Sequence, residues 1–436
     1  MFVTFLGTSS GGGPSESRNC SSLVCDILAD GGLWMVDCAE GTTRQFFLQP
    51  FHPKHQLRVH KVTKVFITHM HADHIMGIVP LLRNILFPPA ADNAPRNDVS
   101  TPRIEIYGPA GLRLFVRQIM KMTLTRTAEK YVVHELLHPE DPVTPCEPSA
   151  PDATESTLNI AEPNVLHVSE LPGRDIRATP DGLWRAIAHG AGQMSPIVVD
   201  AGPILHRGNY YSIDTSQLLI HAQDPCIGYV FTENQGPSRK LVILGDTYDP
   251  TPIIPLCINP PPSLLVHEAT DSDISFHADP SGKLSRRTPT AVHEKALSRG
   301  HSTPHMAGSF AQKINAQKLV LNHIGGRFPA PRSLKDHMRH QIMRDIETKA
   351  SHAWASGKHV IAAHDFLRVE IPYQSDQPSS SALGPGREFH PGNSRSHHEA
   401  EHGEPRPGGH RPHHGHQHHP SREEGSAPGN GKRRRR

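Results

Sequence analysis

Short apolar runs of the β type recur along the first 370 residues, and most of them end in glycine or in polar turn residues. Helical patterns lie between several of these runs, for example over residues 111–121 and 306–316. Strands that alternate with helices are typical of a layered α/β domain, in which helices cover the faces of sheets. The runs expected to form strands are residues 1–6, 22–27, 33–36, 64–68, 104–107, 197–199, 227–232, 240–244, 264–266, 318–322 and 366–371.

The end of the chain has a different composition. After residue 371 the sequence is dominated by Ser, Pro, Gly and His, and it ends in five basic residues at 432–436. Such a segment has too few apolar residues to bury a core, so we expect a disordered tail at 371–436 behind a folded domain at 1–370. Three internal stretches are expected to be insertions or linkers, with a helix in the latter part of the third: residues 88–102, 139–164 and 271–299.

Charge, hydropathy and cysteine usage exclude several classes of protein. Residues 1–370 carry a net charge of −1 and residues 371–436 one of +3, so nucleic-acid binding by the folded part must come from a local basic patch. No apolar run is long enough for a membrane span, and the N-terminus is expected to be a strand rather than a signal peptide. The six cysteines form no Cys-x-x-Cys pair. We therefore expect a reduced, intracellular protein, in the cytosol or, if the basic C-terminus is an import signal, in the nucleus.

The most informative local motif is Thr-His-Met-His-Ala-Asp-His at residues 68–74, directly after an apolar run. Three imidazoles and one carboxylate lie within six residues on the turn that follows the expected strand, so they can converge on one or two divalent ions. These donor types suit zinc. The alternative is a solvated histidine-rich turn in a chain that holds 33 histidines. The four candidate ligands are His69, His71, Asp73 and His74.

With this motif the sequence resembles the metallo-β-lactamase superfamily, whose His-x-His-x-Asp-His signature it matches. The resemblance implies a four-layer αβ/βα sandwich with two zinc ions, whose further ligands are a His, an Asp and a His at the ends of later strands. Asp246, in a Gly-Asp-Thr turn after an apolar run, matches the bridging aspartate, and His323 matches the last ligand. His206 is the preferred middle ligand, because it ends an Ala-x-Pro-x-x-His pattern, whereas His221 is the alternative and His189 a distant third.

Further motifs make the chain similar to ribonuclease Z, the tRNA 3′-end processing endonuclease of this superfamily. The most specific of them are His-Glu-Ala-Thr and Gly-His-Ser-Thr. The matching segments are residues 7–19, 37–45, 267–270 and 300–303. The resemblance implies a zinc-dependent endoribonuclease that removes the 3′ trailer of precursor tRNA by hydrolysis and leaves a 3′-hydroxyl.

The resemblance also implies roles for individual residues. Hydrolysis of a phosphodiester needs an in-line water and a proton for the leaving 3′ oxygen. Asp73 would ligate one ion and hold the attacking water, while His301 would donate the proton and Glu268 would stabilise its imidazolium form. The alternative is that Glu268 and His301 only orient metal ligands. Candidates for contacts to substrate phosphates or to the terminal nucleotide, with structural ion pairs as the alternative, are Arg18, Asn19 and Arg327.

The chain departs from the ribonuclease Z pattern in ways that bear on its substrate. Only eleven residues separate Glu233 from Gly245, so the long tRNA-clamping arm that many of these enzymes carry there is absent. Glu16 stands where the family has a lysine, which weakens the attraction of that loop for RNA phosphates. A hydrolase of small phosphodiesters or sulfate esters is therefore the second hypothesis, and a non-catalytic RNA- or protein-binding relative is the third. Precursor tRNA is the expected partner, no membrane is expected, and a homodimer is a further expectation.

Overall fold

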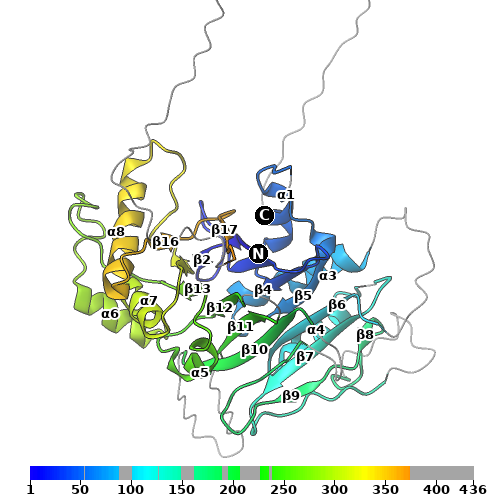
Figure 1. Ribbon diagram of the computed structural model, residues 1–436. Coiled ribbons are helices and arrows are strands. Elements are labelled where there is room, and N and C mark those ends of the chain that lie inside the picture. Colours follow the sequence, from blue (N-terminus) through cyan, green and yellow to red (C-terminus); the bar gives the residue numbers. More distant parts are fainter. Residues whose placement is uncertain are drawn as a thin grey trace, which may run out of the picture. The chain divides into compact units, whose positions relative to one another are not determined.

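Two mixed β-sheets pack face to face in the computed structural model, and helices cover the outer face of each sheet (Figure 1). The structure describes residues 1–53, 55–87, 101–125, 127–148, 162–188, 195–206, 226–234 and 238–373. All of these residues lie in one compact unit, Met1–Pro378. The order helix, sheet, sheet, helix confirms the four-layer α/β sandwich that the resemblance to the metallo-β-lactamase superfamily implied.

The first sheet is built from the N-terminal half of the chain and is extended by one strand from the end of the described residues. Its strands are β1 (Phe2–Gly7), β3 (Ser22–Asp26), β4 (Leu33–Val36), β5 (Val62–Phe66), β6 (Ile104–Pro109), β7 (Tyr131–Leu137), β8 (Glu170–Leu171), β9 (Asp175–Arg177) and β17 (Arg368–Glu370). Their order is β17-β1-β3-β4-β5-β6-β7-β8, with β9 also beside β7. Strands β4 to β7 run parallel, so their carboxyl ends lie at one edge of the sheet.

The second sheet is built from residues 197–362. Its strands are β10 (Ile197–Ile204), β11 (Cys226–Glu233), β12 (Lys240–Leu244), β13 (Leu264–Glu268), β14 (Leu319–Asn322) and β16 (Ile361–Ala362), in that order. Strands β12, β13 and β14 run parallel, whereas β11 is antiparallel to both β10 and β12. The connection from β11 to β12 has six residues, which is too short to form an arm. A small ladder of β2 (Ser9–Ser10) and β15 (Ile324–Gly325) joins the two halves of the chain.

The helices pack on the outer faces through apolar stripes. They are α1 (Thr42–Leu48), α2 (Ala72–Ile75), α3 (Ile78–Leu86), α4 (Leu112–Met122), α5 (Ile254–Cys257), α6 (Pro289–Ser298), α7 (Pro304–Lys313) and α8 (His337–Trp354), with 3-10 turns at Val59–Lys61 and Thr251–Ile253. Buried side chains of α3 and α4 pack on the first sheet, and those of α7 and α8 pack on the second. Among the described helices, none combines the length and the apolar composition that crossing a bilayer requires.

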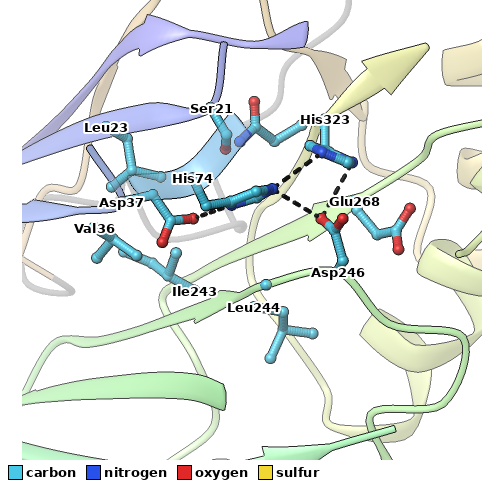
Figure 2. A pocket seen from close by; sticks show the side chains of 12 residues that line it. Ser21, Leu23, Val36, Asp37, His74, Ile243, Leu244, Asp246, Glu268 and His323 are labelled. Atoms are coloured by element: carbon cyan, nitrogen blue, oxygen red, sulfur yellow. Dashed lines mark hydrogen bonds and ion pairs between the residues drawn. The ribbon is translucent and has the colours of Figure 1, made fainter. Parts of the chain in front are cut away.

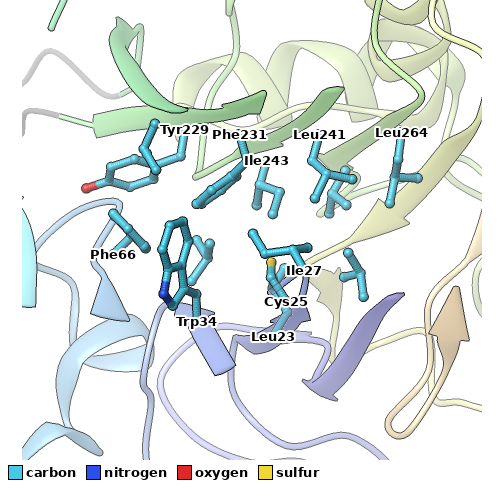
Figure 3. Packing of buried hydrophobic residues seen from close by; sticks show 14 of the residues in the cluster. Leu23, Cys25, Ile27, Trp34, Phe66, Tyr229, Phe231, Leu241, Ile243 and Leu264 are labelled. Atoms are coloured by element: carbon cyan, nitrogen blue, oxygen red, sulfur yellow. The ribbon is translucent and has the colours of Figure 1, made fainter. Parts of the chain in front are cut away.

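The apolar core between the sheets fixes how they face each other (Figure 3). Trp34 and Phe66 of the first sheet meet Phe231 of the second, with ring centroids 6.2 Å and 5.2 Å from that of Phe231. Burying side chains of this size contributes about 1.5–3 kcal/mol each. At the edge of this core the Tyr229 hydroxyl donates a hydrogen bond to the carbonyl oxygen of Ile67 at 2.7 Å. The carboxyl ends of strands from both sheets are thereby held at a common edge.

The strands and helices predicted from the sequence are all present, and the polar stretch 271–299 contains helix α6 as expected. Residues 374–436, 149–161 and 88–100 lie outside the described ranges. The disordered tail and the boundary at residue 370 therefore stay predictions.

Candidate metal centre

Turns that follow parallel strands bring the predicted metal ligands to the common edge of the two sheets, which is where ligand sites form in α/β folds. The first sheet supplies His69 and His71 after β5 and Asp73 and His74 in α2, and the second supplies His206 after β10, Asp246 after β12 and His323 after β14. Gly245 allows this approach, because a Cβ atom there would lie 2.6 Å from the Cβ of Thr68 at the end of the opposite sheet.

Four of the side chains form a first group of ligand atoms. Its members, whose ligand atoms all lie within 4.8 Å of one another, are His69, His71, His206 and Asp246. The Nε2 atom of His69 lies 3.6 Å from Asp246 Oδ2, and both side chains are buried. Three imidazoles and one carboxylate form a donor set that zinc accepts.

The second group contains Asp73, His74 and His323, whose ligand atoms also lie within 4.8 Å of one another. Figure 2 shows His74 and His323 pointing toward Asp246. The Oδ1 atom of Asp246 lies 3.5 Å from His74 Nε2 and 3.2 Å from His323 Nδ1. Since its Oδ2 atom faces His69, Asp246 turns one oxygen toward each group. The resemblance implied a bridging role for Asp246, and that role stays a prediction.

Hydrogen bonds behind the ligands fix the orientation of the imidazoles. His74 Nδ1 donates to Asp37 Oδ2 at 2.7 Å, and His206 Nδ1 donates to the carbonyl oxygen of Gly300 at 2.7 Å. Each bond engages Nδ1 and leaves Nε2 directed at the centre, as in metal sites whose histidines are held by an outer carboxylate or carbonyl.

Two buried atoms of the centre lack hydrogen bonds. Among the residues that the structure describes, His69 Nε2 and Asp246 Oδ1 have no hydrogen-bond partner, although buried polar atoms nearly always have one. Burial lowers the pKa of His69 and of His206, which favours the neutral imidazole that binds a metal. For His74, burial lowers the pKa but the carboxylates of Asp37 and Asp246 outweigh it and raise the pKa to about 10, so the fit to zinc rests on the donor types and the orphaned atoms.

A carboxylate, Glu268, and an imidazole, His301, lie at the edge of these two groups, and the ligand atoms of His301, Asp246 and His323 form a third group within 4.8 Å of one another. Glu268 ends β13, and its Oε1 atom is 3.1 Å from Nδ1 of His301, which precedes α7. Burial favours the neutral forms, but the attraction between the two groups outweighs it, lowering the pKa of Glu268 to about 2 and raising that of His301 to about 9. His301 Nδ1 is also 3.7 Å from Asp246 Oδ2. An ion pair able to hold a proton thus adjoins the centre.

Arg18, predicted as a contact to substrate, is only 2% exposed. Its guanidinium donates to Thr8 Oγ1 at 2.8 Å and to the carbonyl oxygens of Ala363 at 2.6 Å and Phe328 at 3.3 Å. The chain itself therefore uses these donors.

Asn19 and Arg327, the other predicted substrate contacts, lie closer to solvent. The backbone N–H of Asn19 donates to Asp365 Oδ2 at 2.7 Å, and its side-chain amide donates to the carbonyl oxygen of Glu40 at 3.0 Å. Arg327 is 35% exposed, and its Nε atom is 3.7 Å from Asp271 Oδ1. Of the two arginines predicted as contacts, Arg327 has the more open guanidinium.

The structure brings His206 into the first ligand group, whereas the alternatives His221 and His189 lie outside the described residues. Sequence reasoning gave no role to Asp37, which holds His74, or to Thr270, whose hydroxyl donates to Glu268 Oε2 at 2.6 Å. Asp37 follows an apolar strand just as Asp246 does, and this signal could have found it. The N–H of Gly11, which donates to Asp73 Oδ2 at 2.9 Å, left no such signal.

Comparison with known proteins adds three sets of relatives. A family model described as Anti-Pycsar protein Apyc1 matches residues 1–94. Zinc phosphodiesterase ELAC protein 1 of Mus musculus is 30% identical, over 85% of this chain and 99% of the relative, and ribonuclease Z of Acaryochloris marina is 30% identical, over 85% and 98%. The crystal structure of human tRNase Z, short form (ELAC1), superimposes with a TM-score of 0.52 at 28% identity, and the match covers 85% of this chain and 100% of that one.

Proposed function

The chain belongs to the ribonuclease Z family, and we propose that it is a zinc-dependent endoribonuclease that removes the 3′ trailer of precursor tRNA. The observation that carries this proposal is the meeting of two ligand groups at Asp246, which belongs to the first group and lies 3.5 Å and 3.2 Å from His74 and His323 of the second, with the pair of Glu268 and His301 nearby. Metal ligands, a carboxylate that can orient water and a proton donor are the parts that hydrolysis of a phosphodiester requires.

The donor sets support two zinc ions per chain. One would be held by His69, His71, His206 and Asp246, and the other by Asp73, His74, His323 and Asp246. Bound zinc would supply Lewis-acid activation of water and of the phosphoryl group.

Residues of the chain handle the protons of the reaction. Asp73, which the N–H of Gly11 holds at 2.9 Å, orients the attacking water. Protonated His301 donates from Nδ1 to Glu268, which leaves its Nε2–H for the leaving 3′ oxygen. Proton transfer to that oxygen gives the 3′-hydroxyl of the mature tRNA. If Glu268 and His301 only oriented ligands, their removal would change the zinc content as well as the rate.

Small phosphodiesters or sulfate esters are the alternative substrate class, because the six-residue connection between β11 and β12 is too short to form a tRNA-binding arm. We test the choice by incubating the zinc-loaded protein with a precursor tRNA that carries a 3′ trailer and with bis(p-nitrophenyl) phosphate. Cleavage at the end of the mature tRNA, mapped on a sequencing gel, is the expected result. Hydrolysis of the small diester alone would refute the tRNA assignment and favour a hydrolase of small phosphodiesters or sulfate esters.

The same assay also tests the third hypothesis, that the protein is a non-catalytic RNA- or protein-binding relative. All seven predicted ligands are present in the described part of the chain and lie in the two groups. We therefore expect turnover by the wild type and none by Asp73→Ala, whereas binding of RNA without turnover by the wild type would favour a silent relative.

Location and assembly are finer proposals. We propose that the protein acts in the nucleus, the cytosol or both, with residues 432–436 as an import signal, and that it forms a homodimer. Microscopy of tagged full-length and 1–431 chains tests the first proposal, because loss of nuclear signal is expected only for the shortened chain. Light scattering tests the second, and a monomer mass would contradict it.

A further inference from the structure

A cavity of about 280 Å³ opens beside the proton donor. It lies between the loop after β2, the turn after β15 and the end of α6. The lining residues used below are Gly11, Thr270, Lys295, Arg299, His301 and Arg327. His301 and Thr270 belong to the hydrogen-bonded set around Glu268, and Gly11 is bonded to Asp73, so the cavity borders the reactive centre on two sides.

The cavity carries surplus positive charge. Its carboxylate, Asp271, already receives two hydrogen bonds from Arg287, at 2.6 Å and 2.5 Å, which leaves the charge of Arg327 largely uncompensated. Lys295 and Arg299 make no ion pair with any carboxylate among the residues that the structure describes. Lys295 is partly buried and Arg299 is exposed. Three cations thus face a space next to a general acid, which is an arrangement that attracts phosphate groups.

Part of the cavity lining is bare backbone, at Gly11, Gly325 and Gly326. A Cβ atom on Gly11 would meet no atom within 4 Å, and Gly11 has a φ of +94°, which favours glycine. Lys295 and Arg299 are four residues apart at the end of α6 and therefore project from one side of it. Because His301 lines the same cavity, a polymer backbone bound against Lys295 and Arg299 would lie next to it.

We propose that this cavity binds the nucleotide whose 3′ oxygen leaves, and that Lys295 and Arg299 hold the phosphate on its 5′ side. The inference rests on the proposed function, because it takes His301 as the donor to the leaving oxygen. That oxygen has to lie within hydrogen-bond reach of His301, so the nucleotide that carries it occupies the adjoining space. The proposal gives the chain a grip on RNA that is independent of an arm.

The test compares Lys295→Ala, Arg299→Ala and the double variant with wild type. Two exposed cations away from the cavity, Arg83 and Lys313, provide matched alanine controls. For each variant, kcat/KM is measured with precursor tRNA and with bis(p-nitrophenyl) phosphate over a series of KCl concentrations. The small diester has no second phosphate, so the ratio of the two kcat/KM values isolates the interaction with the 5′ phosphate.

We expect each single variant to lower this ratio about tenfold. The slope of log kcat/KM against log [KCl] should become shallower by about 0.7 for each phosphate that the variant no longer binds. The conservative variant Arg299→Lys should recover most of the ratio, and the two controls should match wild type. Equal losses on both substrates, or losses no larger than those of the controls, would overturn the proposal.

Failure of the proposed function gives a different result. If wild type does not cleave precursor tRNA at all, the tRNA assignment is wrong, and the cavity is then tested by binding alone. A fluorescein-labelled RNA tetranucleotide with a free 3′-hydroxyl is titrated with each zinc-loaded protein. Weaker binding by the double variant than by the control variants supports an RNA phosphate site, and equal binding overturns it.

Discussion

Replacing Arg18 by methionine separates the two roles open to this residue, a support beneath the site and a direct contact to substrate. Methionine fills most of the space but removes every donor of the guanidinium. The carbonyl oxygens of Ala363 and Phe328 then lose their hydrogen bonds inside the protein. Thr8 keeps a partner, because its hydroxyl donates to Asp365 at 2.8 Å.

The magnitude follows from the orphaned oxygens. Leaving a buried acceptor unsatisfied costs about 1–3 kcal/mol, and two are created. Part of this loss is offset, because burial of the guanidinium is itself unfavourable and lowers the pKa of Arg18 to about 10. We therefore expect Arg18→Met to lower the free energy of unfolding by about 2–4 kcal/mol.

Urea unfolding of the zinc-loaded chain, followed by the fluorescence of its three buried tryptophans, measures this loss. Arg83→Met, at an exposed position, is the control and should lie within about 0.5 kcal/mol of wild type. Arg18→Lys keeps one donor group and should fall between the two. A variant as stable as wild type whose KM for precursor tRNA rises tenfold would refute the reasoning and place Arg18 in contact with substrate.

Three further predictions concern the reaction. Asp73→Ala should reduce cleavage of precursor tRNA to background, and unchanged turnover would exclude the mechanism. Glu268→Gln should slow cleavage by about 10²- to 10⁴-fold at constant zinc content. The Glu268 carboxylate raises the pKa of His301 to about 9, and the protonated fraction of His301 falls as the pH rises through that value. Glu268→Gln should therefore also move the basic limb of the profile of kcat against pH to lower pH. An unmoved limb would count against His301 as the proton donor. Dialysis against the chelator dipicolinate should abolish activity, and added zinc should restore it. Mass spectrometry of the restored protein should then show two zinc ions per chain, whereas one ion per chain would contradict a dinuclear centre.

The strand ends were the most predictable part of the molecule. Apolar runs bounded by polar turns identify strands such as β5, β12 and β14, and a ligand-type residue directly after such a run identifies the reactive edge. Asp246 and His323 are found in this way because their positions depend only on the neighbouring strand.

Elements whose buried polar side chains pair with residues of other elements were harder to predict. Strand β7 is buried throughout but carries His134 and Glu135, which interrupt its apolar pattern. In the structure His134 pairs with Glu105 at 3.4 Å, and Glu135 accepts a hydrogen bond from the backbone N–H of Arg113 at 3.0 Å. Such partners belong to other elements, and the local sequence carries no sign of them.

The surroundings of Arg18 illustrate the same limit. The loop around it is polar and glycine-rich, which indicates an exposed position, yet Ala363, one of its acceptors, lies 345 residues along the chain. Helix α8 was missed for a related reason, because it is polar except for one narrow buried stripe. That stripe is Ile342, Met343, Ile346, Ala350 and Trp354.

The division of the ligands between the two sheets has a consequence for assembly. Four of them precede residue 75 and three follow residue 205, so neither half of the chain carries a complete set for either ion. Ions bound across this seam would link the two sheets, in addition to the pairing of β2 with β15, and their binding energy would add to the stability of the native state. Loss of zinc would then lower the stability of the protein as well as abolish its activity, and the apo protein should unfold at a lower urea concentration than the zinc-loaded one.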